Sequence, residues 1–110
     1  MITTHVLDVA RGTPAAGLTV ILERRHASAW SPIGRATTDE KGRVASLVDG
    51  QMLPGTYRLT FDTGTYHRDQ RIETPFFPEA KVTFQVLEPN EHYHIPLLLS
   101  PFGYSTYRGA

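Results

Sequence analysis

Residues Thr56 to Asp62 read TYRLTFD, and the alternation within this stretch decides the fold class. Its tyrosine, leucine and phenylalanine stand at every second position, so they share one face of an extended chain, whereas a helix needs a period of about 3.6. The same period of two recurs in LTVILE from Leu18 to Glu23 and in KVTFQV from Lys81 to Val86. These three segments predict half-buried strands.

Further strands and turns alternate along the rest of the chain. The remaining strand candidates are Val6 to Ala10, Ser31 to Thr38, Tyr93 to Ser100 and Gly103 to Arg108. Residues that favour turns separate the candidates, as in Arg11-Gly12-Thr13-Pro14 and Leu53-Pro54-Gly55. Many short strands joined by short turns are typical of a β-sandwich or barrel.

One short helix is expected in this otherwise all-β chain, between Thr63 and Ile72. Asp62 or Thr63 is a suitable N-cap, and Pro75 prevents the helix from continuing. No linker, low-complexity segment or internal repeat divides the sequence. A chain of 110 residues is long enough for one hydrophobic core, so we expect a single domain over residues 1–110.

The composition excludes several classes of function. Lys and Arg total 11 and Asp and Glu total 11, so the formal net charge is zero and no basic stripe is available for nucleic acid. The chain has no cysteine, which rules out a disulfide framework and a thiolate nucleophile. It also lacks a glycine-rich phosphate loop, a Gly-x-Ser-x-Gly elbow and an acidic cluster, so nucleotide, serine-hydrolase and calcium sites are not expected.

The N-terminal stretch MITTHVLDVARG lacks the basic and apolar regions of a signal peptide. No run of about 18 apolar residues, the length needed to span a bilayer, occurs in the sequence. We therefore expect no membrane partner and a soluble, cytoplasmic protein, with periplasmic and peroxisomal locations left open.

The segment HYHIPLLLS from His92 to Ser100 departs from the half-buried pattern. His92, His94, Pro96 and Leu98 share one face of this strand, and Tyr93, Ile95, Leu97 and Leu99 share the other. Neither face is plainly hydrophilic, and one opposing sheet covers only one of them. We therefore expect a second subunit to cover the other face, with the two histidines close to that junction.

The remaining histidines differ in their surroundings. His26 lies at a charged strand end and His67 in the expected helix, and both are interpreted as ordinary surface residues. His5 shares a strand face with Leu7 and Val9, so a buried histidine and a functional one are both compatible with its position.

His92 and His94, two positions apart on one strand face, are compatible with packing or with two ligands of a zinc ion. Arg43 follows the Asp39-Glu40-Lys41-Gly42 turn and begins a strand, and Arg108 lies in the C-terminal tail. Each arginine, taken alone, is also compatible with an ordinary surface charge. These residue types therefore do not define a site by themselves.

Five segments of the chain carry a family resemblance. They are THVLDVARGTPAAGL from Thr4 to Leu18, DEKGR from Asp39 to Arg43, GTYRLTFDTGTY from Gly55 to Tyr66, FFPE from Phe76 to Glu79, and HYHIPLLLSPFGYSTYRG from His92 to Gly109. Together they resemble 5-hydroxyisourate hydrolase, the transthyretin-like enzyme family of purine catabolism, over essentially the whole chain. The tail is the most specific part, because the family ends in Tyr-Arg-Gly-Ser and Tyr107-Arg108-Gly109 match three of these four residues. Transthyretin, the hormone carrier of the same fold, lacks this tail and the catalytic histidines.

The resemblance implies a transthyretin-like two-sheet β-sandwich of about eight strands with one short helix. It also implies a homotetramer with active sites in a channel at the dimer–dimer interface, and 5-hydroxyisourate as the substrate. Neither a cofactor nor a metal is implied.

The family's functional positions map onto residues of this sequence. The resemblance implies catalytic roles for His5, Arg43 and His94, and contacts to substrate from His5, Arg43, Tyr107 and Arg108. The supporting positions are His92, Ser105 and Ala110. Ala110 stands where the family has serine, so restoring a serine hydroxyl is expected to raise activity or leave it unchanged.

Opening the ring of 5-hydroxyisourate requires an activated water, a stabilised oxyanion and a proton for the departing nitrogen. We predict His94, sharing a proton with His5, as the general base, and Arg43 as the group that stabilises the oxyanion. One alternative is a carrier of the same fold that binds a small ligand without turnover. Another is a zinc hydrolase with His5, His92 and His94 as ligands, although no further ligand is evident to complete the zinc site.

Overall fold

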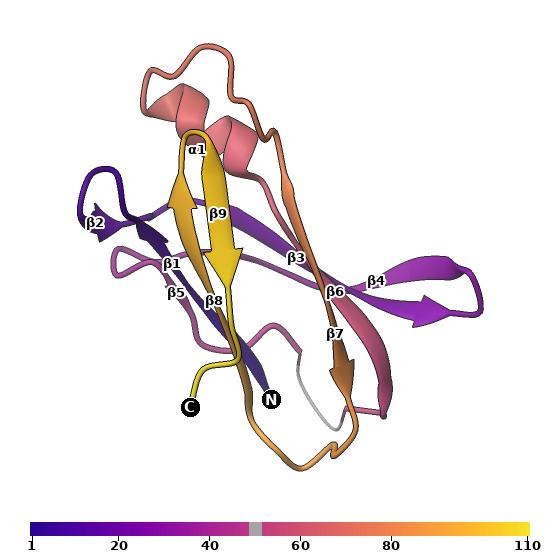
Figure 1. The fold of residues 1–110 in the computed structure, drawn as a ribbon. Helices are drawn as coiled ribbons and strands as arrows, with labels where there is room; N and C mark the ends of the chain where they lie inside the picture. Colours follow the sequence, from indigo (N-terminus) through magenta and orange to yellow (C-terminus); the bar gives the residue numbers. More distant parts are fainter. Residues whose placement is uncertain (49–51) are drawn as a thin grey trace.

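The computed structural model describes residues 1–48 and 52–110, and this part of the chain forms nine strands in two sheets and one short helix (Figure 1). The elements are β1 (Ile2–Asp8), β2 (Thr13–Pro14), β3 (Thr19–His26), β4 (Ala29–Thr37), β5 (Arg43–Val44), β6 (Gly55–Phe61), α1 (Thr63–Asp69), β7 (Ala80–Val86), β8 (Tyr93–Ser100) and β9 (Gly103–Thr106). This arrangement confirms the predicted all-β sandwich with one helix.

β1, near the N-terminus, pairs both with β8, near the C-terminus, and with β5, which follows the turn of residues 39–42. The first sheet has the order β2-β1-β8-β9, with β5 also paired to β1, and the second has the order β4-β3-β6-β7. β1 and β8 are parallel, with Thr3 opposite His94 and His5 opposite Pro96. β1 and β5 are antiparallel, with His5 opposite Arg43. The middle of β1 therefore lies between the strand that carries His94 and the strand that carries Arg43.

Inward-facing side chains of both sheets form the core. The tyrosine, leucine and phenylalanine of the TYRLTFD stretch in β6 are at most 1% exposed, so the period of two in the sequence reflects burial. On β8, Leu97 and Leu99 are buried in the same core. The opposite face of β8 carries His94 and Leu98, which are half-buried.

Strand boundaries differ from the sequence prediction at both ends of the chain. β1 begins at Ile2 and ends at Asp8, so Val9, expected on the strand face of His5, lies beyond the strand and is 54% exposed. β9 ends at Thr106, so Tyr107 and the following residues lie past the last strand.

The helix α1 confirms one prediction and corrects another. The side chain of Asp62 accepts a 3.1 Å hydrogen bond from the backbone N–H of Thr65, as expected of an N-cap. His67, interpreted as a surface residue, is instead 1% exposed. Thr63 and His67 are four residues apart and therefore share the side of the helix that faces the protein, and both are buried. Within residues 1–48 and 52–110, no helix has the length and apolar character needed to cross a membrane.

Candidate active site

A hydroxyl group shared by two imidazoles is the first feature of the site. Thr3 Oγ1 lies 2.7 Å from His92 Nε2 and 2.8 Å from His94 Nδ1. The parallel register produces this contact, because it places Thr3 opposite His94 on a neighbouring strand, at a spacing of about 4.8 Å. In the described part of the chain no group bonds to His94 Nε2, so this nitrogen is the one available to a substrate.

His5 and Arg43 lie directly opposite each other on β1 and β5. His5 Nε2 lies 2.9 Å from the carbonyl oxygen of Lys41, and because a carbonyl only accepts hydrogen bonds, this nitrogen carries a proton. In a neutral His5 the lone pair is therefore on Nδ1. The side chain is half-buried on the outer face of the first sheet, so His5 is not a core histidine.

The turn before β5 positions Arg43. The Asp39 carboxylate accepts hydrogen bonds from the backbone N–H groups of Lys41 and Arg43, both at 2.9 Å. The bond from the Arg43 N–H is the main cause that lowers the pKa of Asp39 below its usual range. Gly42 has a φ of 75°, and a Cβ there would collide with the carbonyl oxygen of Val6, so this turn requires glycine.

Arg43, His92 and His94 line one open pocket of about 360 Å³, together with Thr3 and Ala110. This volume is within the range of small-molecule sites. The structure thus brings together four residues that the sequence singled out, and adds Thr3, which sequence reasoning missed. Thr3 lies here because β1 pairs with β8, and no local sequence pattern predicts a pairing between strands so far apart in the chain.

Burial and the neighbouring positive charges favour the neutral form of His94. Burial is the main cause that lowers the pKa of His94 below 6.5, and His92, His5 and Arg43 act in the same direction through their positive charge. A neutral imidazole with an unbonded ring nitrogen can accept a proton near pH 7. His5 is not one of the side chains that line the pocket, but it is close enough to influence this titration.

The C-terminal tail returns to His94. The backbone N–H of Gly109 donates a 2.7 Å hydrogen bond to the carbonyl oxygen of His94, and the two residues form an isolated antiparallel bridge. This bridge places Ala110 at the pocket. Ser105 lies opposite Leu98, farther along β8, and is not among the pocket residues.

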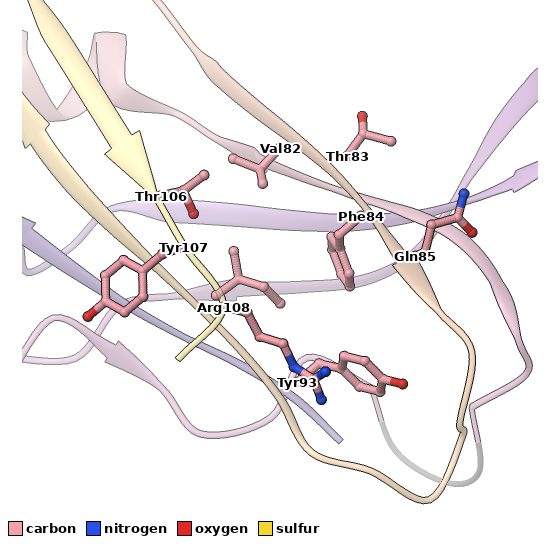
Figure 2. A pocket seen from close by; sticks show the side chains of 9 residues that line it. Val82, Thr83, Phe84, Gln85, Tyr93, Thr106, Tyr107 and Arg108 are labelled. Atoms are coloured by element: carbon pink, nitrogen blue, oxygen red, sulfur yellow. The ribbon is translucent and has the colours of Figure 1, made fainter. Parts of the chain in front are cut away.

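Tyr107 and Arg108 lie outside this pocket in the single chain. They line a separate groove beside β7, where Figure 2 shows the side chain of Arg108 next to Tyr93. Arg108 forms a 2.8 Å ion pair with Glu91, and its guanidinium lies 4.6 Å from the centre of the Tyr93 ring. The substrate contacts assigned to Tyr107 and Arg108 stay predictions.

The two neighbouring imidazoles are directed at a hydroxyl rather than at a common ion position. His92 Nε2 and His94 Nδ1 both face Thr3 Oγ1. Among residues 1–48 and 52–110 there is no group of three or more His, Cys, Asp or Glu side chains that could hold a metal ion. The site combines a base with a cation, which suits activation of water and stabilisation of an oxyanion.

Comparison with known proteins identifies the family. The sequence matches the model of the HIUase/Transthyretin family over residues 2–109. The 5-hydroxyisourate hydrolase of Salmonella dublin is 43% identical over 111 residues, which covers 100% of this chain and 81% of that protein. The structure of Klebsiella pneumoniae 5-hydroxyisourate hydrolase has a TM-score of 0.87 and 35% identity, covering 99% of this chain and 98% of that chain. Sea bream transthyretin in complex with thyroxine has a TM-score of 0.91 and 35% identity, covering 99% of this chain and 94% of that chain. This chain therefore belongs to the HIUase/Transthyretin family.

Proposed function

We propose that this protein hydrolyses 5-hydroxyisourate to 2-oxo-4-hydroxy-4-carboxy-5-ureidoimidazoline in urate degradation. The observation that carries the proposal is the convergence of Arg43 and His94 on one pocket, with His5 directly opposite Arg43. Relatives named 5-hydroxyisourate hydrolase match essentially the whole chain, which supports the same reaction here.

In this proposal His94 is the general base. Its Nδ1 is bonded to Thr3, so Nε2 is the nitrogen that takes a proton from the attacking water. The lowered pKa favours the neutral imidazole at neutral pH. Base assistance of this kind is typically worth about 10²- to 10⁴-fold in rate.

Arg43 stabilises the oxygen that becomes negatively charged when water adds to the carbonyl carbon. Its planar guanidinium presents several N–H donors in one plane, which suits the coplanar oxygens of a urate-like ring. The bond to the ring nitrogen then breaks, and the nitrogen takes the proton held by His94. When His5 is neutral, its lone pair is on Nδ1, because its Nε2–H donates to the carbonyl of Lys41.

A carrier function is the alternative. Sea bream transthyretin shares the fold of this chain and was solved in complex with thyroxine. Retention of an apolar ligand needs no base beside an arginine, whereas the pocket here contains Arg43, His92 and His94. Hydrolysis is therefore the better-supported function.

A homotetramer is part of the proposal. The outer face of the first sheet carries Leu7 directly opposite Leu98, close to the strand positions of His5 and His94. An apolar face of this kind is stabilised when a second copy covers it.

Light scattering at micromolar concentration is expected to give about four times the 12.3 kDa chain mass, and a 12.3 kDa monomer would contradict the assembly. In this assembly, Tyr107 of one protomer contacts substrate bound beside a neighbouring protomer.

An absorbance assay with freshly generated 5-hydroxyisourate tests the function. We expect the protein to accelerate the loss of substrate absorbance well beyond the rate in buffer. Binding of the compound without acceleration would support the carrier instead.

A further inference from the structure

The hydroxyl of Thr3 has two imidazole partners but only one proton. The side chain is buried, with 9% of the residue exposed, and Oγ1 lies 2.7 Å from His92 Nε2 and 2.8 Å from His94 Nδ1. A hydroxyl can donate one hydrogen bond and accept two. If both imidazoles donated to it, its own proton would have no acceptor among the described residues. The hydroxyl therefore donates to one nitrogen and accepts from the other.

The two possible arrangements give His94 opposite tautomers. When Thr3 donates to His92, it accepts from Nδ1–H of His94, and Nε2 of His94 has a lone pair. When Thr3 donates to His94 Nδ1, Nε2 of His94 carries the proton instead. Only the first tautomer is a general base, because the hydrogen bond at one ring nitrogen sets the state of the other.

We propose that Thr3 is a positioning residue that holds His94 in its base tautomer and relays a proton between His94 and His92. This inference rests on the proposed hydrolase function. After His94 Nε2 takes a proton from water, Nδ1–H passes its proton to the Thr3 oxygen while the Thr3 hydroxyl proton passes to His92 Nε2. One proton enters the hydroxyl as another leaves, so Thr3 stays neutral, His94 becomes neutral and His92 carries the positive charge.

The difference in exposure gives the relay its direction. Both imidazoles line the pocket that contains Arg43, but His92 is exposed whereas His94 is half-buried. A positive charge is more stable on an imidazole that water can solvate than on one that is partly removed from water. The reverse transfer returns a proton to His94 Nδ1 when Nε2–H is given to the departing ring nitrogen.

Two substitutions at Thr3 separate the hydroxyl from the shape of the side chain. Thr3→Val removes the hydroxyl but keeps the branched shape, and we expect kcat to fall at least about tenfold while KM changes less than about twofold. Thr3→Ser keeps the hydroxyl and is expected to retain most of kcat. Thr37→Val, at an exposed threonine of β4, is the matched control and is expected to match the parent. A folded Thr3→Val protein with the kcat of the parent would overturn the inference.

Nitrogen-15 NMR of the histidine rings, recorded without substrate, gives a readout independent of turnover. We expect the parent to hold His94 mainly with its proton on Nδ1, and Thr3→Val to lose that preference. If the parent protein holds His94 with its proton on Nδ1 but does not hydrolyse 5-hydroxyisourate, the role of Thr3 in setting the tautomer is supported and the proposed function is contradicted. A parent with the proton of neutral His94 on Nε2 would overturn the inference whatever its activity.

His92→Ala provides a second test that does not depend on a buried position, and it applies even if Thr3→Val does not fold. Loss of the exposed imidazole removes the group that accepts the Thr3 hydroxyl proton in the proposed arrangement. We expect a lower kcat and a smaller fraction of the Nδ1–H tautomer of His94. His26→Ala, at another exposed histidine, is the control. An unchanged kcat together with an unchanged tautomer in His92→Ala would contradict the relay.

Discussion

Gly109 packs its bare α-carbon against the imidazole of His94: a Cβ at this position would lie 2.5 Å from His94 Cδ2 and 3.2 Å from Cγ. The hydrogen bond from the Gly109 N–H to the His94 carbonyl holds the tail at this distance. The tail and the proposed base therefore fit together as one unit, and a side chain at position 109 must displace one of them.

Gly109→Ala is accordingly expected to reduce kcat/KM at least about tenfold, because small misplacements of a reacting group are costly. Gly103→Ala is the matched control, since a Cβ there would have no neighbour closer than 3.9 Å. Initial rates of 5-hydroxyisourate hydrolysis by the two variants give the comparison. Equal rates would show that contact between the tail and His94 does not matter for catalysis.

The end of the chain is expected to respond differently to deletion and to substitution. Removal of residues 107–110 takes away Gly109 and its bond to His94 and should abolish most activity. Ala110→Ser adds one hydroxyl at the pocket and should raise kcat or leave it unchanged. Initial rates at saturating substrate test both variants. Full activity of the truncated protein would exclude the tail from the site.

The pKa of His94 is expected to rise when a neighbouring positive charge is removed. Burial is the main cause that lowers this pKa below 6.5, and the charge of Arg43 adds to it. Arg43→Gln should therefore shift the NMR titration of His94 to higher pH, whereas Arg35→Gln, at an exposed arginine of β4, should not. Because the native state disfavours protonated His94, the stability that depends on this group is present above pH 6.5 and is lost as the pH falls. A titration that does not move in Arg43→Gln would contradict the electrostatic account.

A buried hydrogen bond between Tyr66 and Asp8 is expected to stabilise the junction of α1 with β1. The Tyr66 hydroxyl donates to Asp8 Oδ2 at 2.7 Å, and both residues are buried. Tyr66→Phe leaves the carboxylate without this donor, so the free energy of unfolding should fall by about 1–3 kcal/mol. Urea unfolding at pH 7 measures the change, with Tyr104→Phe, at an exposed tyrosine, as the control. A loss no larger than that of the control would count against the bond.

Ionisation of the Tyr66 hydroxyl is expected to lower the free energy of unfolding at high pH. Burial, followed by the bond to Asp8, raises the pKa of Tyr66 to about 12 from 10.0. Between these values the unfolded state loses the proton while the native state keeps it, so the contribution of Tyr66 to stability is present below pH 10 and is lost towards pH 12. Urea unfolding across this range should show a smaller decline in Tyr66→Phe than in the parent.

The strands were predictable because burial on one face leaves a period of two in the sequence, as in the TYRLTFD stretch of β6. The two-residue strands β2 and β5 are too short to carry any period, although β5 places Arg43 opposite His5. His67 was wrongly interpreted as a surface residue because a seven-residue helix shows too little of an apolar stripe to identify its buried side.

The site was predictable only in part, because some of its contacts join residues that are far apart in the sequence. His94 and Arg43 were identifiable from residue type together with the family resemblance. Thr3 was not, because it meets His94 across 91 positions of sequence through a parallel pairing that no local pattern encodes. The roles assigned to Tyr107 and Arg108 depend on neighbouring protomers and stay predictions.

In the proposed reaction, His94 activates water for the hydrolysis of 5-hydroxyisourate. The most direct test is the initial rate of loss of substrate absorbance for the parent, His94→Ala and His26→Ala, at equal concentration and with the same assembly state. We expect His94→Ala to be at least about a hundredfold slower than the parent, the low end for loss of a general base, and His26→Ala to match it. A His94→Ala protein that is correctly assembled and as fast as the parent would contradict the account.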